Sequence, residues 1–591
     1  MKQNPKNFDA VIHNEEFEKE FAGKELTHQT MIYDAGRETE LLSGVWHFAV
    51  DQYDMSLRSK WFLEKVKDDN GRYLPLDYDF EQWETTKVPS CWNMQKEKYF
   101  YYESNGLYTR KFKFFKKNSD ERVFLKIGAA SYSARVFLNK KFIGSHQGAS
   151  TPFYVEITKD LQEENRIFVV VENRRKPDRV PMHNTDWFNY GGLYRDVELI
   201  RVPETFIRSF YVQLVPDTGM KKMEIRIDID GNDVNGVARL VIEELGIDKN
   251  IKIIDGKAWE VLDAQPVLWA PENPKLYKVQ LVYEKDSIQE EIGFREIKVD
   301  GTDILLNGEK IFLAGISCHE ESVLNGKAIT EEEIIENFTI AKEMNCNYMR
   351  LAHYPHTSKA AKIADRMGIM LWEEIPVYWS IAFENKPTYE DAENQLIEMI
   401  NRDQNRASVI IWSVGNENAD IDSRLEFMKS LALKTKQVDP SRPISAACCV
   451  NKVDNKIEDR LIEYLDIIGI NQYYGWYDPD FGKLPKLFEN SDPSKPVIIT
   501  EFGGGAKAGH HGAEDEYFTE ENQRCLYRTQ ISTMRNIKYI KGMSPWILYD
   551  FRCPRRTNPF QELYNRKGLL SEDKKIRKPG FYIMQNFYQE K

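Results

Sequence analysis

Cysteine is scarce in this 591-residue sequence, and the cysteines present are scattered. None forms the Cys-x-x-Cys pair typical of metal sites, and their number, seven, is odd. This pattern predicts reduced thiols and a cytoplasmic protein, and it disfavours a framework of disulfides. The residues concerned are Cys91, Cys318, Cys346, Cys448, Cys449, Cys525 and Cys553.

Long apolar runs are also missing. A membrane-spanning helix needs about eighteen consecutive apolar residues, and no such stretch occurs, so we expect no membrane partner. The N-terminal segment MKQNPKNFDAVIHNEEFEKEF lacks the apolar core of a signal peptide, which fits the same expectation. The sequence shows no internal repeat and no low-complexity segment.

Positive charge is in deficit, with a net charge of −12 and an isoelectric point near 5.6. A protein that binds nucleic acid through phosphate contacts usually carries the opposite sign, so we expect no nucleic-acid partner. An anionic substrate would be repelled by the overall field. Such a substrate would need a local cationic site.

The first half of the chain contains short β-like runs separated by turn residues. From residue 40 to about 200, runs such as SGVWHFAV, ERVFLKIGAA and RIFVVVENR predict an all-β sandwich that follows a polar N-terminal extension of about 30 residues. A second block of strands, closing near GFREIKV, predicts a small immunoglobulin-like sandwich. We therefore expect domains over residues 1–202 and 203–297.

From about residue 298 to 591, short apolar strands alternate with helical stretches, as expected of a (β/α)₈ TIM barrel. An open doubly wound sheet is disfavoured because no glycine-rich phosphate turn is present. The helices include EEEIIENFTIAKEMN and SRLEFMKSLALKTKQV. The predicted strands are IFLAGISC, NYMRLAHYP, MLWEEIP, SVIIWSVGNE, ISAACC, DIIGINQYY, PVIITEFG and GMSPWILYDF.

Two glutamates stand at predicted strand ends, where a barrel carries its catalytic groups. Strand four ends with Asn416 and Glu417, and strand seven ends with Glu501. Strands four and seven reach the barrel mouth from opposite sides, so the two carboxylates can face each other. A separation of about 5–5.5 Å between them would suit a retaining glycosidase.

The two glutamates need opposite protonation states in that mechanism. Glu501 follows a buried β-branched run and precedes glycines that leave room for a sugar ring, so we assign it as the nucleophile. Glu417 is then the acid/base, and repulsion between the carboxylates helps it keep a proton. Asn416 is placed to hydrogen-bond the sugar 2-hydroxyl.

Several strings resemble glycoside hydrolase family 2 over most of the chain. GNEN at 415–418 and TEFGG at 500–504 are similar to its acid/base and nucleophile motifs. Further similar strings are VPSCWN, HQGASTPFYVEIT, NTDWFNYGGLYRDV, GFREI and MRLAHYPH. The resemblance implies a jelly-roll β-sandwich, an immunoglobulin-like β-sandwich and a C-terminal TIM barrel, in that order.

Within this family the chain most resembles the bacterial β-glucuronidases. The segment INQYYGWY implies that Tyr473 and Tyr477 line the active site. The segment YNRKG contains Asn565 and Lys567, which by resemblance recognise the sugar carboxylate. An amide and a lysine two residues apart can both reach one carboxylate, and their charge-assisted bonds would distinguish a uronic acid from a neutral sugar.

The resemblance has one departure and carries over further positions. Gln561 stands where the β-glucuronidases have an arginine, and Arg555, Arg556 and Arg566 are nearby candidates to compensate. Asp186, within NTDWFNYGG, is implied to contact sugar hydroxyls. His319 and Glu374 are plausible rim residues, and Trp546 is expected to form a floor for the sugar. The adjacent His510 and His511 are treated as loop residues, so we expect no metal site.

The sequence thus predicts a retaining exo-β-glycosidase that hydrolyses β-D-glucuronides through a covalent intermediate and needs no cofactor. The expected partner is a small-molecule glycoside, and the resemblance implies a homo-oligomer, either a tetramer or a dimer. The alternatives are a β-galacturonidase or a β-galactosidase of the same family. A non-catalytic carbohydrate-binding protein is a remote alternative, because both glutamates are present.

Overall fold

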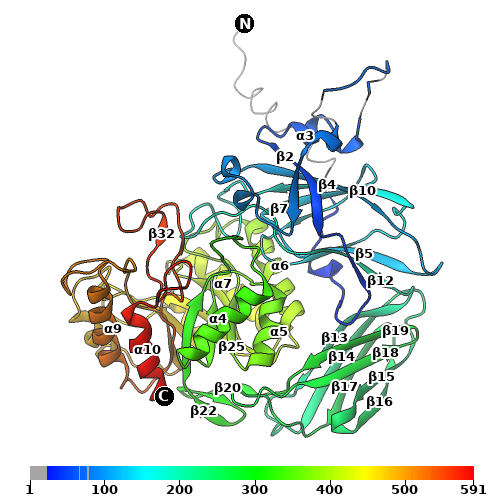
Figure 1. The fold of residues 1–591 in the computed structure, drawn as a ribbon. Coiled ribbons are helices and arrows are strands. Elements are labelled where there is room, and N and C mark those ends of the chain that lie inside the picture. The colour runs from blue at the N-terminus through cyan, green and yellow to red at the C-terminus, as the bar shows by residue number, and fades with distance from the viewer. Residues whose placement is uncertain (1–20, 22, 66, 69, 76–78) are drawn as a thin grey trace. The chain divides into compact units, whose positions relative to one another are not determined.

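The computed structural model describes residues 21, 23–65, 67–68, 70–75 and 79–591 (Figure 1). The predicted N-terminal extension lies largely outside these residues. Contacts divide the chain into two compact units, which are described separately here. The first contains the described residues up to Ile32 together with Arg37–Arg174 and Asn189–Glu204, and the second contains Tyr33–Gly36, Arg175–Phe188 and Thr205–Lys591.

The first unit is an antiparallel β-sandwich of two main sheets, with a small extra sheet and a short helix, α3 (Met55–Arg58). One sheet has the order β1 (Thr39–Leu41), β12 (Val197–Val202), β5 (Arg122–Ile127) and β9 (Phe153–Glu156). The other has the order β3 (Glu84–Val88), β2 (Gly44–Asp51), β4 (Asn105–Lys113), β10 (Glu164–Glu172), β7 (Ser133–Leu138) and β8 (Lys141–Gln147). The extra sheet pairs β6 (Ala130–Ser131) with β11 (Gly192–Leu193).

Trp92, from the string VPSCWN, is a fully buried anchor of the sandwich core. A Cβ atom added at Gly191 would come within 2.0 Å of the Trp92 ring, and one at Gly106 within 2.6 Å. Only glycine therefore fits at these two positions. The Gly191 amide also donates a hydrogen bond to the Asn93 side-chain oxygen, 98 residues earlier in the chain. The strings VPSCWN and NYGG therefore pack against each other.

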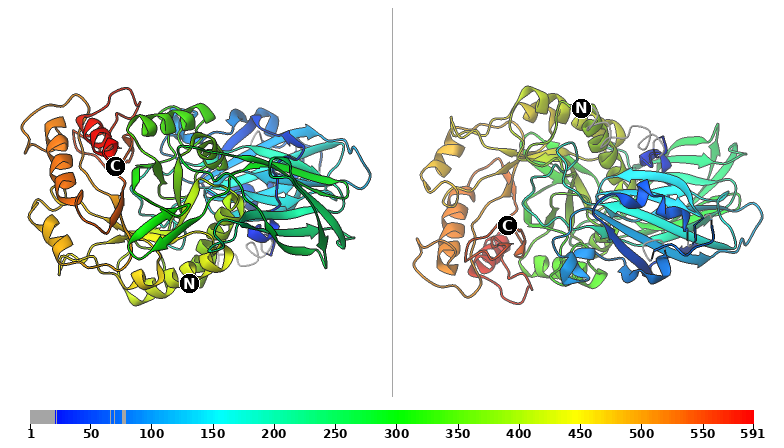
Figure 2. Two further views of the ribbon diagram at one scale, coloured as in Figure 1. Left: turned by 90° about the horizontal axis from the view of Figure 1, so that it is seen from below. Right: turned by 90° about the horizontal axis from the view of Figure 1, so that it is seen from above.

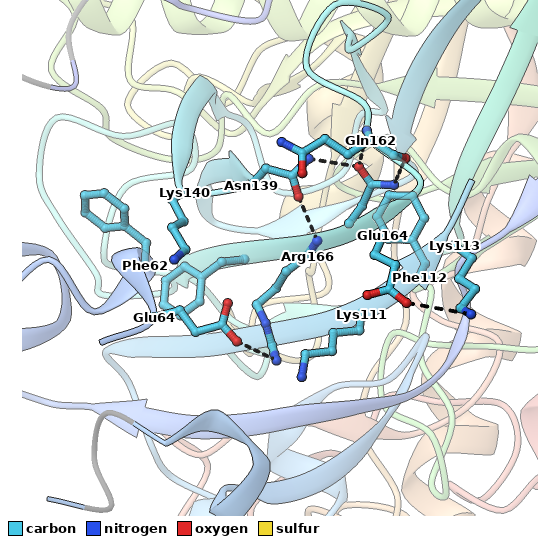
Figure 3. A pocket seen from close by; sticks show the side chains of 12 residues that line it. Phe62, Glu64, Lys111, Phe112, Lys113, Asn139, Lys140, Gln162, Glu164 and Arg166 are labelled. Atoms are coloured by element: carbon cyan, nitrogen blue, oxygen red, sulfur yellow. Dashed lines mark hydrogen bonds and ion pairs between the residues drawn. The ribbon is translucent and has the colours of Figure 1, made fainter. Parts of the chain in front are cut away.

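A cavity of about 610 Å³ opens on the first unit between β4, β10 and the segment that carries Phe62 and Glu64 (Figure 3). Four cationic side chains line it, and acids in the same unit pair with three of them, Lys111, Lys113 and Arg166. The Arg166 guanidinium lies 2.9 Å from Glu64, and Lys113 lies 3.7 Å from Glu164. The lining therefore offers little uncompensated positive charge to a ligand.

The second unit begins with another antiparallel sandwich, whose strands alternate buried and exposed residues. Its β14 (Lys222–Asp230) has the sequence KMEIRIDID, in which every second side chain is buried in the sandwich core. One sheet orders β13 (Phe206–Leu214), β14 and β17 (Lys257–Asp263), and the other orders β16 (Ile247–Ile253), β15 (Gly236–Ile242), β18 (Tyr277–Tyr283) and β19 (Asp286–Ile292). A small sheet of β20 (Ile297–Asp300), β21 (Asp303–Leu306) and β22 (Glu309–Ile311) follows.

Eight parallel strands then close into a barrel, which confirms the predicted α/β class. Nearly every residue of these strands is buried, as expected of strands covered on both faces. In order they are β23 (Leu313–Cys318), β24 (Tyr348–Leu351), β25 (Met370–Glu374), β26 (Val409–Asn416), β27 (Ile444–Cys449), β28 (Ile468–Asn471), β29 (Val497–Glu501) and β30 (Ile540–Met543).

Helices follow the barrel strands and stand outside them (Figure 1), although β27 and β28 are joined only by a short 3-10 helix at Arg460–Tyr464. They are α4 (Glu331–Glu343), α5 (Ser358–Met367), α6 (Lys386–Asp403), α7 (Asp422–Val438), α8 (Lys483–Glu489), α9 (Glu520–Met534) and α10 (Pro579–Gln589). In α4, Thr330 and Glu333 form a reciprocal capping box at the N-terminus. Helices α9 and α10, orange and red in Figure 2, pack side by side. None of the helices in the described ranges is long and apolar enough to cross a membrane.

The eighth predicted strand was placed wrongly. The sequence suggested GMSPWILYDF, but β30 ends at Met543 and the following segment is irregular up to the short β31 (Phe551–Arg552), which pairs with β32 (Tyr564–Asn565). Pro545 has no N–H to donate to a strand ladder, so regular pairing stops there. The consequence is that Trp546 lies in a loop beyond the strand.

The segment Arg175–Phe188 belongs to the second unit although the chain on both sides of it belongs to the first. Val180 is fully buried in the main barrel core, and its carbonyl accepts a hydrogen bond of 2.9 Å from Gln395 on α6. The carbonyl of Asp178 likewise accepts from Thr388 at 2.9 Å. This segment, which lies within the predicted first domain, therefore fixes Asp186 against the barrel.

A buried ion pair supports the start of β26, the strand that leads to Glu417. Asp439 accepts hydrogen bonds from Arg442 (2.6 Å) and from the Trp412 indole (2.8 Å). Arg442 also donates to the carbonyl of Val409 at 2.7 Å. Burial alone would raise the pKa of Asp439, but Arg442 and the hydrogen bonds outweigh it and lower this pKa to about 2.

We predict that Asp439→Asn destabilises the fold by about 3–5 kcal/mol, because it leaves Arg442 buried without a counter-charge. Denaturant unfolding measures the change. The wild-type contribution should be present above the ordinary aspartate pKa of 3.8 and be lost as the pH falls toward about 2. The control is Asp422→Asn, at the start of α7, whose side chain is 95% exposed. A loss as small as in this control, about 0.5 kcal/mol or less, would contradict the prediction.

Candidate active site

The two predicted catalytic glutamates stand at the carboxyl ends of their strands. Glu501 is the last residue of β29, and Glu417 directly follows β26. At Gly415, before Glu417, an added Cβ would come within 2.8 Å of the Val377 carbonyl, so this glycine lets β26 approach the loop after β25. Both glutamates thus stand at the barrel mouth directly after closely packed strands.

Both carboxylate oxygens of Glu501 accept hydrogen bonds. Arg350 donates to Oε1 at 2.8 Å, and the Tyr473 hydroxyl donates to Oε2 at 2.6 Å. His353 Nε2 lies 3.8 Å from Oε1. Donors on both oxygens and an adjacent guanidinium suit an ionised carboxylate held in one orientation.

Glu417 has a different environment. One of its oxygens, Oε2, accepts a hydrogen bond of 2.8 Å from the Trp379 indole. Burial raises the pKa of Glu417 above its usual value, and the charge of Glu501 raises it further. The site therefore holds one carboxyl that favours its proton beside a carboxylate compensated by an arginine.

Arg350, fully buried on β24, connects the groups around Glu501. It donates to Glu374 at 2.9 Å and to the Asn416 side-chain oxygen at 2.8 Å, in addition to Glu501. Burial would raise the pKa of Glu374, but Arg350 and a hydrogen bond from His353 lower it to about 2. Glu374 is therefore a permanent counter-charge and is unsuited to proton transfer.

The amide of Asn416 has one unused donor. Its oxygen accepts from Arg350 and, at 3.1 Å, from Asn471, whereas its Nδ2 is buried without a partner among the described residues. Because the oxygen is held by two donors, the amide orientation is fixed. The free N–H group can therefore serve a substrate hydroxyl.

A second cluster surrounds Asp186. The Asp186 carboxylate accepts from Arg556 at 2.6 and 3.1 Å and from Asn565 at 2.9 Å. Burial would raise the pKa of Asp186, but the charges of Arg556 and Lys567 lower it below its usual value. Asp186 is thus an ionised acceptor held by a loop from the first half of the sequence.

Lys567 and Arg556 converge on the hydroxyl of Tyr477. The Lys567 ammonium donates to this oxygen at 2.7 Å, and two Arg556 nitrogens lie 3.4 Å from it. Burial would raise the pKa of Tyr477, but the two cations lower it. A cavity of about 210 Å³ borders these three residues. The Tyr473 ring, 5.2 Å from that of Tyr477, links this cluster to Glu501.

Trp546 and His319 pack into an aromatic cluster beside both groups. The Trp546 ring stacks on His353 at 4.7 Å and meets His319 edge-on at 5.3 Å. Burial and the neighbouring His353 lower the pKa of His319 well below its usual value, so this ring is neutral. Its Nδ1 pairs with Tyr354 at 3.1 Å, and its Nε2 has no partner within the described part of the chain.

The ten site residues predicted from the sequence therefore fall into three contiguous groups. Four of them gather at the strand ends, four around Asp186, and two in the aromatic cluster. The prediction did not include Arg350, His353, Trp379 or Asn471 as site residues. Arg350 had a visible signal, a charged residue within the apolar strand YMRL, whereas Trp379 lies in a loop with no comparable pattern.

The three arginines near Gln561 have different environments. Arg566 pairs with Glu572 at 2.6 Å and with Asp550 at 3.3 Å, and the Arg555 guanidinium covers the Trp379 ring at 5.1 Å. The Gln561 side-chain oxygen accepts from Asn558 at 2.7 Å. Arg556 is the one of the three that reaches both Asp186 and Tyr477.

Metal ligands do not gather in the described residues: no group of three or more His, Cys, Asp or Glu side chains could hold an ion. His511 Nδ1 instead lies 3.0 Å from Glu521 on α9. His510 packs its ring 5.1 Å from that of Phe560.

Comparison with known proteins places this architecture in a family. The TIM-barrel domain model of the family 2 glycosyl hydrolases matches residues 297–590, and the sugar binding domain model of that family matches 39–203. A third model, described as glycosyl hydrolases family 2, matches 205–295. The chain belongs to glycosyl hydrolase family 2.

Relatives of this family 2 glycoside hydrolase span almost the same length. A β-glucuronidase from Paenibacillus borealis is 28% identical over 91% of this chain and 95% of its own. Among solved structures, a β-glucuronidase from Ruminococcus gnavus superposes with a TM-score of 0.83 at 23% identity, covering 96% of this chain and all of its own. A family 2 β-galacturonidase from Eisenbergiella tayi, bound to galacturonate, has a TM-score of 0.81 at 23% identity and covers 95% and 99%. The two structures show a shared fold.

Proposed function

We propose that this family 2 enzyme is a retaining β-glucuronidase in which Glu501 is the nucleophile and Glu417 the acid/base. The contrast between their environments carries the proposal. Arg350 and Tyr473 hold the Glu501 carboxylate, whereas burial and the charge of Glu501 favour a proton on Glu417. A retaining mechanism requires this division between the two carboxyl groups.

In the first step, a Glu501 oxygen forms a bond to the anomeric carbon as the bond to the leaving oxygen breaks. Glu417 gives its proton to that oxygen, which takes the electron pair. In the second step, Glu417 removes a proton from water, the water oxygen bonds to the anomeric carbon, and the Glu501 carboxylate leaves. Two inversions retain the β configuration. The free Asn416 N–H is available to the sugar 2-hydroxyl.

The substrate assignment depends on the cluster around Asp186. Arg556 pairs with the Asp186 carboxylate, the charge of Lys567 also lowers the pKa of Asp186, and both cations contact the Tyr477 oxygen. Two cations converging on one oxygen supply the local positive site that an anionic sugar needs in an acidic protein. We propose that Lys567 and Asn565 bind the C6 carboxylate and that Arg556 takes the place of the arginine missing at Gln561. Asp186 then accepts from sugar hydroxyls, while Trp546, Tyr473, Tyr477 and His319 enclose the ring.

The alternatives are a β-galacturonidase and a β-galactosidase of the same family, and a non-catalytic carbohydrate-binding protein. The E. tayi β-galacturonidase shares this fold, and the C4 hydroxyl contacts would separate it from a β-glucuronidase. The seven cysteines, all free thiols, support the proposed cytoplasmic location. The homo-oligomer stays a prediction, which mass photometry of the purified chain would test.

A panel of 4-nitrophenyl β-D-glycosides tests the activity. The expected result is a kcat/KM for glucuronide at least ~10-fold above those for galacturonide, galactoside and glucoside, a factor worth about 1.4 kcal/mol in transition-state binding. Glu501→Gln should lower turnover by at least ~10³-fold, because nucleophile and base act as a unit. The exposed Glu426→Gln on α7 is the control. Faster galactoside cleavage would refute the substrate assignment, and an active Glu501→Gln would refute the mechanism.

Two variants test the carboxylate site. Lys567→Ala should lower kcat/KM for glucuronide by ~10²-fold, about 2.7 kcal/mol, and that for glucoside much less. Arg556→Gln should also lower the glucuronide-to-glucoside ratio, because one of two converging cations is lost. If Arg556→Gln lowers kcat/KM for glucuronide and for glucoside by the same factor, Arg556 does not bind the carboxylate and only positions Asp186. Arg524→Gln on α9 provides the matched loss of a surface charge.

A further inference from the structure

Trp379, in the loop after β25, contacts the acid/base directly. Its indole Nε1 donates to Glu417 Oε2 at 2.8 Å. One face of its ring stacks on Tyr378, with ring centroids 4.6 Å apart and planes 27° apart. The Arg555 guanidinium lies 5.1 Å from the ring centroid. The indole is therefore held in one orientation and aimed at one oxygen of the carboxyl group.

The backbone on both sides of this contact is in an unfavourable conformation. Trp379 has a φ of 54° and Glu417 a φ of 51°, the left-handed region that non-glycine residues rarely adopt. Strain of this kind persists only where surrounding contacts enforce it, and it concentrates at functional sites. Here the strained conformation occurs at both Trp379 and Glu417, the two partners of one hydrogen bond.

Three further contacts enforce that conformation. The Trp379 amide donates to the Asn416 carbonyl at 2.9 Å, and the Asn418 side chain donates to the Trp379 carbonyl at 2.8 Å. The Glu417 amide donates to the carbonyl of Ala447 at 2.7 Å. The loop after β25 and the GNEN segment are thus joined on both sides of the side-chain contact.

The hydrogen bond decides which carboxyl oxygen carries the proton. An N–H group can only donate, so Oε2 of Glu417 must be the accepting oxygen. In a protonated Glu417 the carbonyl oxygen is the stronger acceptor of the two, so the indole contact to Oε2 favours the proton on Oε1. With the proton on Oε2 the indole N–H would meet a hydroxyl oxygen, a weaker acceptor than a carbonyl oxygen, and this arrangement is less favourable.

We propose that Trp379 is a positioning residue that fixes the proton of Glu417 on Oε1, from which it is delivered to the leaving oxygen. This inference rests on the proposed role of Glu417 and is independent of which sugar is cleaved. During glycosylation the Oε1 proton passes to the leaving oxygen as that oxygen takes the electron pair of the breaking bond. The anomeric carbon simultaneously bonds to Glu501.

The test is Trp379→Phe, which keeps a ring and removes the N–H donor. It should be assayed as kcat/KM on two substrates with the sugar that the wild type cleaves fastest. A phenyl glycoside needs a proton on its leaving oxygen, whereas a 2,4-dinitrophenyl glycoside hardly does. The phenyl substrate should lose at least ~10-fold, within the ~10²–10⁴-fold worth of general acid catalysis, and the dinitrophenyl substrate less than ~3-fold.

The pH profile provides a second readout. Burial and the charge of Glu501 raise the pKa of Glu417, whereas the indole N–H and the Asn471 amide favour the ionised carboxylate and lower this pKa. Removing the indole N–H should move the alkaline limb of kcat/KM to higher pH. A purely structural role for the ring would not shift this limb.

Trp259→Phe is the matched control, because the exposed Trp259 also donates to a glutamate, Glu224, at 2.6 Å, but on the second sandwich. It should leave both substrates and the pH profile unchanged. Retained dinitrophenyl activity also shows that Trp379→Phe has folded. Equal losses on both substrates, or an unshifted alkaline limb, would overturn the proposal. A wild-type chain that cleaves no glycoside would instead overturn the proposed function itself.

Discussion

The active site is organised by the burial of one positive charge. The Arg350 guanidinium is completely enclosed within the barrel, where an unpaired charge would be very unfavourable. Two carboxylates, Glu374 and Glu501, compensate it, and the Asn416 oxygen takes a further N–H. The Glu374 side chain is fully buried, whereas Glu501 keeps 6% of its side chain exposed at the end of β29, so Glu501 is the one of the two that a substrate can reach. Pairing with the buried Arg350 thus holds Glu501 in position and favours its ionised form.

The same charge balance sets the two glutamates apart. Glu501 has a cation beside it, whereas the charge that most affects the pKa of Glu417 is that of Glu501 itself, which raises it. Glu417 therefore tends to keep a proton, although both residues are glutamates at the ends of apolar strands. The surroundings of each glutamate therefore decide its role. A glutamate placed elsewhere on the rim would not have the same protonation state.

The sequence was most informative where pattern and position coincide. Apolar strands that end in a carboxylate predicted Glu417 and Glu501 at the rim, and the barrel class is confirmed. The exact domain boundaries and the roles of the site residues remain predictions. Strand eight was misplaced because PWILYDF has a strand-like composition, yet Pro545 cannot continue a ladder. Arg350 was overlooked because its partners, Glu374 and Glu501, come from two other strands.

Arg556 shows a different limit of sequence reasoning. It precedes Gln561 by five residues. The sequence alone does not show which of the nearby arginines reaches the site. In the structure, the Leu563 amide donates to the Arg556 carbonyl at 2.8 Å, and the Cys553 amide donates to the Leu563 carbonyl at 2.7 Å. The loop closes on itself in this way and brings Arg556 to Asp186. Such a closure depends on backbone pairings that no local pattern encodes.

The segment Arg175–Phe188 has a consequence for how the chain can be divided. It leaves the first unit, packs against α6, presents Asp186 and returns to the first unit at Asn189. A fragment cut at the start of the barrel would carry both glutamates yet lack Asp186, and Arg556 would lose its buried counter-ion. The site is thus built from segments on both sides of the barrel's first residue. The barrel alone is therefore not a complete module for recombination.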